Sequence, residues 1–501
     1  MATNPTSPSW PFVRFIENIL LNSQSVLAFA QHSLYAIPQI SNGYRKDMPV
    51  QSKFYEVDRV RPYELPPSIQ NWLPEKHLAR FVVEIVEMLD LSALKDAYTR
   101  RGPQGYDPTV LLALLFYGYA TGVFSSRKLE RQTYDSVAFR FITANSHPDH
   151  DSIAAFRKRF LPLIKKLFVQ ILLIAHEMGV LKLGSVSLDG SKVKANASKH
   201  KALSYDHACK LENQLKAEIA ELLRKAESTD RAEIPDGMSI PDELERREQR
   251  LFAIAAAKVE IEKRAVVRHQ RELAAYEKKL ADRAKKVLET GKKSRGKTPK
   301  APEPGPTGKD QVNLTDEESR IMPTSSGGFE QAYNVQAGVD TASKLIVSAH
   351  VTQQSNDKLE MIPTLENLVN LPKDLGTVKE MLADTGYLSE SNVTACEGQG
   401  IIPYIAVGRQ EHHPPLEDRF LEPPPLPDDA DSMDKMKHRL KTKAGKALYA
   451  LRKVTSEPVF GIIKAVMGFR SFMLRGLEAV EGEWSLVCMA WNIKRLHVLS
   501  I

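Results

Sequence analysis

Residues 185–190 read SVSLDG, and at this stretch the pattern of the chain changes from helical to β. Before Gly184, apolar residues recur every three or four positions, as on one face of a helix. After it they alternate with polar residues, which predicts a strand ending at Asp189. Later β-like runs are AYNVQAGVD (332–340), KLIVSAHVT (344–352), VKEMLAD (378–384) and IIPYIAV (401–407). A helix-sized segment opening at Ser389 separates the last two, so the sequence predicts an α/β layered fold.

The N-terminal part of the chain is expected to be helical. Residues 51–180 carry three long amphipathic segments, and we predict an all-α domain there. Asp107 and Asp151 are the expected helix starts. Residues 1–50 are polar and rich in proline at the start, which favours a weakly ordered extension over an amphipathic helix packed on the body.

A segment of different composition interrupts the α/β part. Within residues 200–325 lie two highly charged stretches with a narrow alanine and leucine stripe, which predict a helical hairpin or antiparallel coiled coil. A Gly/Pro/Lys-rich linker follows at 291–310. The predicted core therefore consists of 181–199 and 326–410. A Pro-rich loop (411–435) and C-terminal helices (436–501) complete the chain.

Composition excludes some classes of protein. The 501 residues carry a net charge of +7, which permits a polyanionic partner without requiring one. The three cysteines are far apart, so a disulfide scaffold and a zinc finger are not expected. No secretory signal is recognisable, and the longest apolar run, near 110–124, is too short to cross a bilayer. We expect a cytoplasmic protein without a membrane partner.

One stretch has the residue spacing of a phosphate-binding motif but not its expected surroundings. GKKSRGKT (291–298) has the spacing of a P-loop, but a charged helix precedes it and Pro299 follows it. A P-loop works between a buried strand and a helix, so ATP is not an expected ligand.

Three acids could form a metal site. Asp189 and Asp384 each end a predicted strand, and Glu457 lies near a helix start, with Ser456 available as its cap. Carboxylates are the ligands that Mg²⁺ prefers, and two such ions can catalyse attack on a phosphodiester. Taken singly, an Asp before Gly at a strand end is more often a turn residue. Glu478 and Glu483 are rival third acids, for which surface or structural roles are favoured.

The surroundings of these acids resemble a known family. DGSKVKANASKH (189–200), ADTGYLSES (383–391) and YALRKVTSEPVFGIIK (449–464) look like the three catalytic blocks of bacterial insertion-sequence DDE transposases, closest to the eleven-eighty-two branch of the IS-four/IS-five superfamily. Tyr449, Arg452, Glu457 and Lys464 match its Tyr–Arg–Glu–Lys signature, with four residues between Arg and Glu where three are usual. The resemblance covers roughly residues 55–501.

The resemblance implies a fold, a site and a reaction. The fold would be α/β, an RNase H-like catalytic core interrupted by the helical coiled-coil insertion. The all-α domain at 51–180 would precede it and bind DNA. Asp189, Asp384 and Glu457 would hold Mg²⁺ or Mn²⁺, as two ions, and Tyr449, Arg452 and Lys464 would contact DNA. Lys192 and Lys194 are further candidates for phosphate contact. The enzyme would cut double-stranded DNA at terminal inverted repeats and join it to target DNA, acting as a homodimer.

Three other readings stay open at this point. The chain could be an RNase H-like nuclease that cuts without strand transfer. It could be a domesticated or inactive DNA-binding protein, whose effect would not depend on Asp189. It could also be a coiled-coil scaffold, a reading that rests only on residues 205–290.

Overall fold

The computed structural model describes residues 68–98, 105–228, 239–291, 296–324, 327–408, 422–427 and 429–501. The expected extension at 1–50 lies outside the described residues, as do residues 411–421 of the Pro-rich loop. In the described part of the chain, no helix is both long and apolar enough to cross a membrane.

The N-terminal region is helical, as predicted. Its elements are η1 (Ile69–Asn71), α3 (Leu78–Met88), α4 (Ser92–Asp96), α5 (Pro108–Ala120), α6 (Ser126–Asp135), α7 (Val137–Ile142) and α8 (His150–Glu177). Asp107 caps α5 by accepting from the Thr109 backbone N–H at 2.8 Å. The predicted start of α8 at Asp151 is wrong, because Asp149 accepts from the Ser152 N–H at 2.8 Å and begins the helix earlier.

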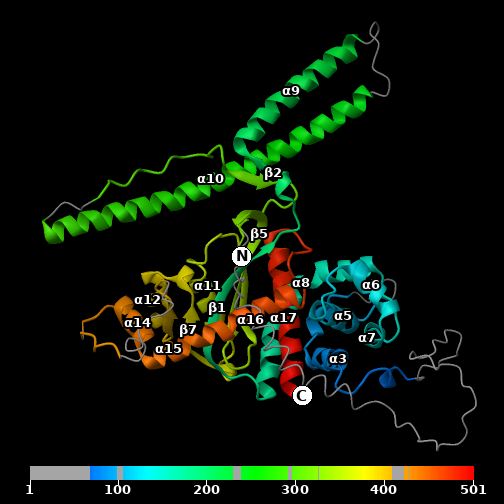
Figure 1. Cartoon of the computed structure of the whole chain (residues 1–501). Coiled ribbons are helices and arrows are strands. Elements are labelled where there is room, and N and C mark those ends of the chain that lie inside the picture. Colours follow the sequence, from blue (N-terminus) through cyan, green and yellow to red (C-terminus); the bar gives the residue numbers. More distant parts are fainter. Residues whose placement is uncertain are drawn as a thin grey trace, which may run out of the picture. The chain divides into compact units, whose positions relative to one another are not determined.

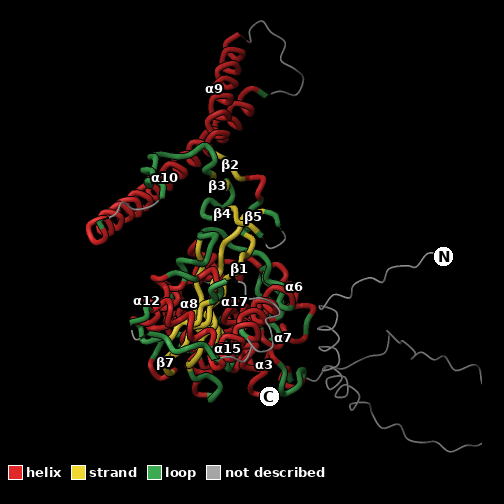
Figure 2. The backbone as a smooth tube through the Cα atoms, turned by 60° about the vertical axis from the view of Figure 1, so that its left-hand side comes forward, coloured by secondary structure: helices red, strands yellow, loops and turns green. Residues whose placement is uncertain are grey.

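One mixed six-stranded sheet forms the centre of the α/β region (Figures 1 and 2). Its strands are β1 (Leu183–Lys194), β4 (Arg320–Pro323), β5 (Phe329–Asp340), β6 (Ile346–Thr352), β7 (Gly376–Ala383) and β8 (Ile402–Ile405). The order is β4-β5-β1-β7-β8, with β6 also paired to β5. β1 is parallel to β7 and antiparallel to β5. The first strand and the later strands thus share one sheet although the insertion separates them in sequence.

Strand β1 does not end at Asp189, and that prediction is wrong. Backbone pairing with β5 continues from Val186, opposite Asp340, to Lys194, opposite Ala332. Val193, on the same strand face as Asp189, is buried within this paired stretch. Ser187 is the last residue of β1 that pairs with β7. Asp189 therefore lies on the part of β1 that extends beyond its parallel neighbour.

Helices from the C-terminal half pack on this sheet. They are α11 (Met361–Val369), α12 (Glu390–Gly398), α14 (Ser432–Lys441), α15 (Lys443–Ala450), α16 (Ser456–Ala465) and α17 (Leu477–Ser500), with short turns η3 (Lys373–Leu375), η4 (Thr385–Tyr387) and η5 (Leu451–Val454). The buried helix α17 contacts β6 as well as α5 and α8. Its Trp484 donates to the Gln336 carbonyl at 3.1 Å, which ties the helix to β5. The helical region and the sheet therefore share one apolar core.

The insertion contains two antiparallel helices, α9 (Tyr205–Ser228) and α10 (Ile240–Thr290), which lie side by side in Figure 1. Arg247 bonds Glu218 at 2.9 Å and Lys258 bonds Glu212 at 2.7 Å, and this pairing fixes the antiparallel direction. A small sheet that the sequence did not predict, β2 (Ala202–Ser204) with β3 (Gln311–Asn313), joins the two ends of the insertion (Figure 2).

The linker after α10 is more fixed than its composition suggested. Residues 296–310 form turns and irregular segments without helix or strand, as expected. They nevertheless contact α10, because Arg268 bonds Asp310 at 2.6 Å and the Gly305 carbonyl at 3.2 Å. The P-loop-like motif begins at Gly291, which ends α10 with a φ of 64°.

Candidate active site

Asp189 sits on β1 where the neighbouring strand β7 has ended. Its carboxylate accepts from the Gly190 N–H at 2.9 Å and is 16% exposed. Ser187, two residues earlier on the same strand face, has its hydroxyl 3.1 Å from that of Ser456 on α16. Asp189 therefore faces the C-terminal helical segment that carries the predicted glutamate.

Asp384 follows the last residue of β7 and begins the short turn η4. Its carboxylate accepts from the Gly386 N–H at 2.8 Å, which holds it at the end of the strand. Because β1 and β7 are parallel neighbours, Asp384 and Asp189 lie at the same end of this strand pair.

Glu457 lies in the first turn of α16, followed by Pro458. Ser456 does not cap this helix as expected, since Thr455 is the N-cap residue and its side chain makes no cap bond. The turn η5 and an unusual backbone at Thr455 (φ −116°, ψ −83°) separate α15 from α16. This break accommodates the additional residue between Arg452 and Glu457.

Arg452 joins all three acids. Its Nη1 lies 3.1 Å from Oε1 of Glu457, and its Nη2 lies 3.5 Å from Asp189 and 3.8 Å from Asp384. Side chains from a strand, a strand end and a helix start thus converge on one guanidinium that is 13% exposed.

The electrostatics of this cluster are dominated by negative charge. Burial raises the pKa of Asp189 to about 6, with Asp384 and Glu457 adding to the shift and Arg452 opposing it. Burial acts to lower the pKa of Arg452, but the charges of Asp189 and the other nearby groups outweigh it and raise that pKa. One arginine therefore compensates only part of the charge of three carboxylates.

The predicted basic and aromatic residues lie around the same acids. Burial raises the pKa of Tyr449, and Asp384, Glu457 and Asp189 raise it further against Arg452. Lys464 on α16 donates to the Ser191 hydroxyl and, at 3.1 Å, to the Lys192 carbonyl. It is thereby held on β1, two residues beyond Asp189.

Lys192 and Lys194 continue along β1 on one strand face. Lys192 Nζ lies 3.5 Å from Asp357, and Lys194 Nζ lies 3.3 Å from Glu330. The Lys194 side chain is 58% exposed, whereas that of Lys192 is 21% exposed.

The sequence reasoning missed a polar network behind the acids. Asp357, in the loop after β6, accepts from Asn334 at 2.7 Å and from Gln336 at 2.8 Å. The side-chain amide oxygen (Oε1) of Gln336 in turn accepts from the hydroxyl of buried Tyr387, three residues after Asp384. A signal was present, because Asn334 and Gln336 are polar residues at alternate positions within 332–339, whose other residues have no charged or amide side chain.

Gly190 is required by this packing. A Cβ atom at position 190 would lie 2.6 Å from Oδ1 of Asp357, and the Gln336 amide would be equally crowded. A Cβ atom at Gly386 would lie 2.9 Å from Asp384 and 3.7 Å from Asp357. Asp384 and Asp357 therefore both lie against Gly386 in the turn η4.

The rival acids lie elsewhere. Glu483 is fully buried on α17, where it accepts from Tyr119 at 2.9 Å and from the Leu474 N–H at 2.9 Å. Glu478 is exposed at the start of the same helix. Glu483 thus fixes a loop and an N-terminal helix to α17, which is a structural role.

The acids suit a divalent cation in chemistry, although they are not arranged as a closed cage. Among the described residues, no group of three or more His, Cys, Asp or Glu is close enough to hold one ion. Asp189, Asp384 and Glu457 instead enclose the Arg452 guanidinium. Three carboxylates converging on one cationic group, with negative charge in excess, are the donor set that hard cations select.

Two family models match the chain. A transposase domain (DUF772) matches residues 67–159, and a transposase DDE domain matches residues 297–493. The matches support a DDE transposase family. The first covers the N-terminal helices, and the second includes Asp384 and Glu457 but not Asp189. Searches of curated proteins and of solved structures gave no match.

A DDE domain supports a transposase function and an enzyme that acts on DNA. It also agrees with divalent metal use, which is general among such domains. The mixed sheet with a helical N-terminal region is compatible with the expected α/β architecture.

Proposed function

We propose that this chain is a DDE transposase whose catalytic residues are Asp189, Asp384 and Glu457. It cuts DNA at the ends of its own element and joins the freed 3′-hydroxyl to target DNA. The observation that carries the proposal is the convergence of these three acids on Arg452. The acids come from three separated segments, and two of those segments lie within the matched DDE domain.

The same three carboxylates would hold Mg²⁺ or Mn²⁺, as a pair of ions. The bound ions would activate the attacking water and stabilise the leaving oxygen of the phosphodiester. The chain's own contribution is to position these ligands on rigid elements, the sheet and the start of α16. The buried setting of Asp189 keeps water away from one side of the site.

Cations beside the acids would hold the DNA. Lys464, bound to β1 next to Asp189, is positioned to contact a phosphate close to the scissile bond. Tyr449 lies beside the same acids. Lys192 and Lys194 extend the positive charge along the strand. Two DNA ends must be held together for joining, so we propose a homodimer on DNA.

The proposal is tested with purified protein, Mg²⁺ or Mn²⁺, and DNA that carries the sequences flanking the gene. Asp189→Asn, Asp384→Asn and Glu457→Gln should each lower nicking at least about a hundredfold, because metal ligands supply several kcal/mol of transition-state stabilisation. Glu478→Gln is the matched control, an exposed acid on α17. Adding a target plasmid should produce joined products with the wild-type protein.

The outcomes separate the candidate functions. Nicking without joined product would favour a nuclease over a transposase. If Asp189→Asn kept wild-type nicking activity, the assignment of Asp189, Asp384 and Glu457 as the catalytic residues would be wrong. DNA binding with no cleavage under any divalent ion would favour a DNA-binding protein without catalysis.

A further inference from the structure

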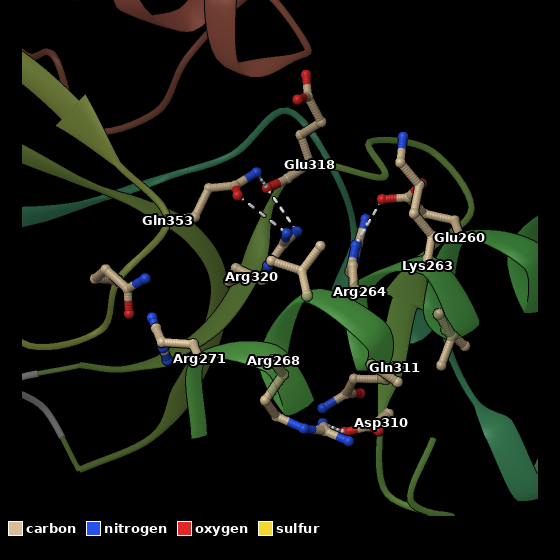
Figure 3. Close-up of a pocket in the computed structure, with 14 residues that line it drawn as sticks. Glu260, Lys263, Arg264, Arg268, Arg271, Asp310, Gln311, Glu318, Arg320 and Gln353 are labelled. Atoms are coloured by element: carbon tan, nitrogen blue, oxygen red, sulfur yellow. Dashed lines mark hydrogen bonds and ion pairs between the residues drawn. The ribbon is translucent and has the colours of Figure 1, made fainter. Parts of the chain in front are cut away.

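A basic cavity lies between α10 and the end of the sheet, away from the three acids. It has a volume of about 510 Å³ and is lined by α10, β3, β4 and the segment after β6. Figure 3 shows Lys263, Arg264, Arg268 and Arg271 entering from α10, and Arg320 from β4. Five cations thus gather where the insertion meets the core.

The acids in the cavity are largely engaged. Glu260 binds Arg264 at 2.7 Å, and Asp310 binds Arg268 at 2.6 Å. Glu318 accepts from the Leu477 N–H at 2.7 Å. In the described part of the chain, neither Lys263 nor Arg271 has an ion pair, and both are exposed. Their charge is therefore available to an anion.

Arg320 shows that the cavity holds positive charge without a carboxylate partner. Its guanidinium donates to the carbonyls of residues 317–319 and to the amide oxygen of Gln353 at 3.1 Å. Burial and the neighbouring Arg264 lower the pKa of Arg320 to about 10, although Glu260 and Glu318 act in the opposite direction. Two guanidinium groups side by side in a half-buried cavity favour an anion between them.

Sheet register relates the cavity to the acids. Asp189 pairs with Ala337 of β5, whereas Arg320 of β4 and Lys194 of β1 both pair with Ala332. Five residues of strand span about 17 Å. β4 is also two strands away from β1 in the sheet, so the cavity is farther still from Asp189.

The side chains between the two places are also basic. Lys192 and Lys194 share a strand face, and directly opposed residues of antiparallel strands share that face as well. Lys194 and Arg320 therefore flank Ala332 on one face of the sheet. These cations lie on the sheet face opposite to Asp189, at the end of β1 that is nearer to the cavity.

We propose that this cavity binds the sugar-phosphate backbone of duplex DNA, at a distance from the phosphate cut at the acids. The inference rests on the proposed function, since it assumes DNA at Asp189. Lys263 and Arg271, eight residues apart on α10, would each contact a phosphate. The insertion is then a clamp on the DNA rather than a spacer.

The test measures binding of the full-length protein to a fluorescent 30-base-pair duplex over a range of salt concentrations. Lys263→Gln with Arg271→Gln should weaken binding and reduce the salt dependence by about one for each lost phosphate contact, in the slope of log K against log salt. Lys278→Gln with Lys279→Gln is the matched control, because these are exposed lysines farther along α10. The control should keep the wild-type slope.

An unchanged salt slope in the cavity variant would overturn the proposal. An equal loss of DNA binding in both double variants would also overturn it, because it would indicate general attraction of DNA by the charged helix. Polyglutamate and inorganic phosphate serve as further probes. If the cavity variant lost polyglutamate binding and kept its DNA slope, an acidic protein segment would be the ligand instead. If the wild type nicks DNA and the cavity variant binds DNA as the wild type does, only this inference fails. If the wild type neither binds nor nicks DNA, the proposed function fails as well.

Discussion

Arg452 donates a 3.1 Å hydrogen bond to Glu457, five positions later in the chain, across a break between two helical segments. In a continuous helix, residues four apart would be neighbours and residues five apart would diverge. The turn η5 and the backbone at Thr455 remove this mismatch. The longer spacing between Arg and Glu is thus compatible with the glutamate facing Asp189 and Asp384.

Replacing Arg452 is expected to separate metal binding from catalysis. Arg452→Gln removes the cation that the three carboxylates now contact, so Mg²⁺ should bind more tightly than in the wild type. Nicking should nevertheless fall, since the proposed phosphate contact is lost. Calorimetric titration with Mg²⁺ and a nicking assay on one preparation measure both effects. Weaker Mg²⁺ binding in the variant would show that Arg452 supports the metal site rather than competing for it.

Much of the architecture could be predicted from local patterns. The change from helical to alternating periodicity at Gly184 located β1, and Ser389 begins the helix before β8 as expected, by accepting from Asn392 at 3.2 Å. These features depend on residues close together in sequence. Strand β1 was cut short at Asp189 because Asp–Gly is a turn signal, and only pairing with β5 extends the strand beyond it.

For the polar network, the sequence marked Asn334 and Gln336 as unusual but could not give their contacts. Asp357, Gln336 and Tyr387 meet only through the register of β5 and the turn after β7. A single sequence contains no information on such long-range contacts unless a residue stands out from its neighbours. Arg452 was named from the family signature, but its position among all three acids is a property of the folded chain.

Gly190→Ala should damage the site without touching an acid. The added methyl group would overlap Asp357 and Gln336 and force them to move. Overpacking of this kind costs about 1–3 kcal/mol of stability. Nicking should fall more than stability at assay temperature explains, since Asp189 is the adjacent residue. Urea unfolding and nicking rates provide the comparison, and Gly184→Ala, also on β1 but with open space around its Cβ position, is the control for general glycine effects.

Asp357→Asn is expected to act through its neighbours. The change keeps the shape but removes the charge that Lys192 approaches at 3.5 Å and places an amide against the amides of Asn334 and Gln336. We expect about a 10- to 100-fold loss of nicking, typical of residues that orient metal ligands. The loss should be mainly in kcat, while binding of a fluorescent duplex stays within a few-fold of wild type. A loss confined to DNA binding would instead indicate that Asp357 only positions Lys192.

The buried Glu483 predicts a pH-dependent stability. Burial raises its pKa above the ordinary 4.5, with opposition from the Leu474 N–H, Arg157, Tyr119 and the Met473 N–H. Above pH 4.5 the folded chain therefore binds this proton more strongly than the unfolded chain, so the free energy of unfolding should fall as pH rises through the folded pKa. Glu483→Gln removes this titration. Urea unfolding between pH 4 and 8 should show the difference between wild type and variant shrinking with rising pH, then levelling off.

The comparison with a second variant isolates that titration. Glu483→Gln also loses acceptor capacity for the Met473 and Leu474 N–H groups, which shifts stability by a constant amount of about 1–3 kcal/mol. Only the slope with pH therefore reports on the buried carboxyl. Glu478→Gln, exposed on the same helix, should leave the wild-type pH profile unchanged. A wild-type profile parallel to that of Glu483→Gln would mean that Glu483 stays ionised in the fold, held by its N–H donors, Tyr119 and Arg157.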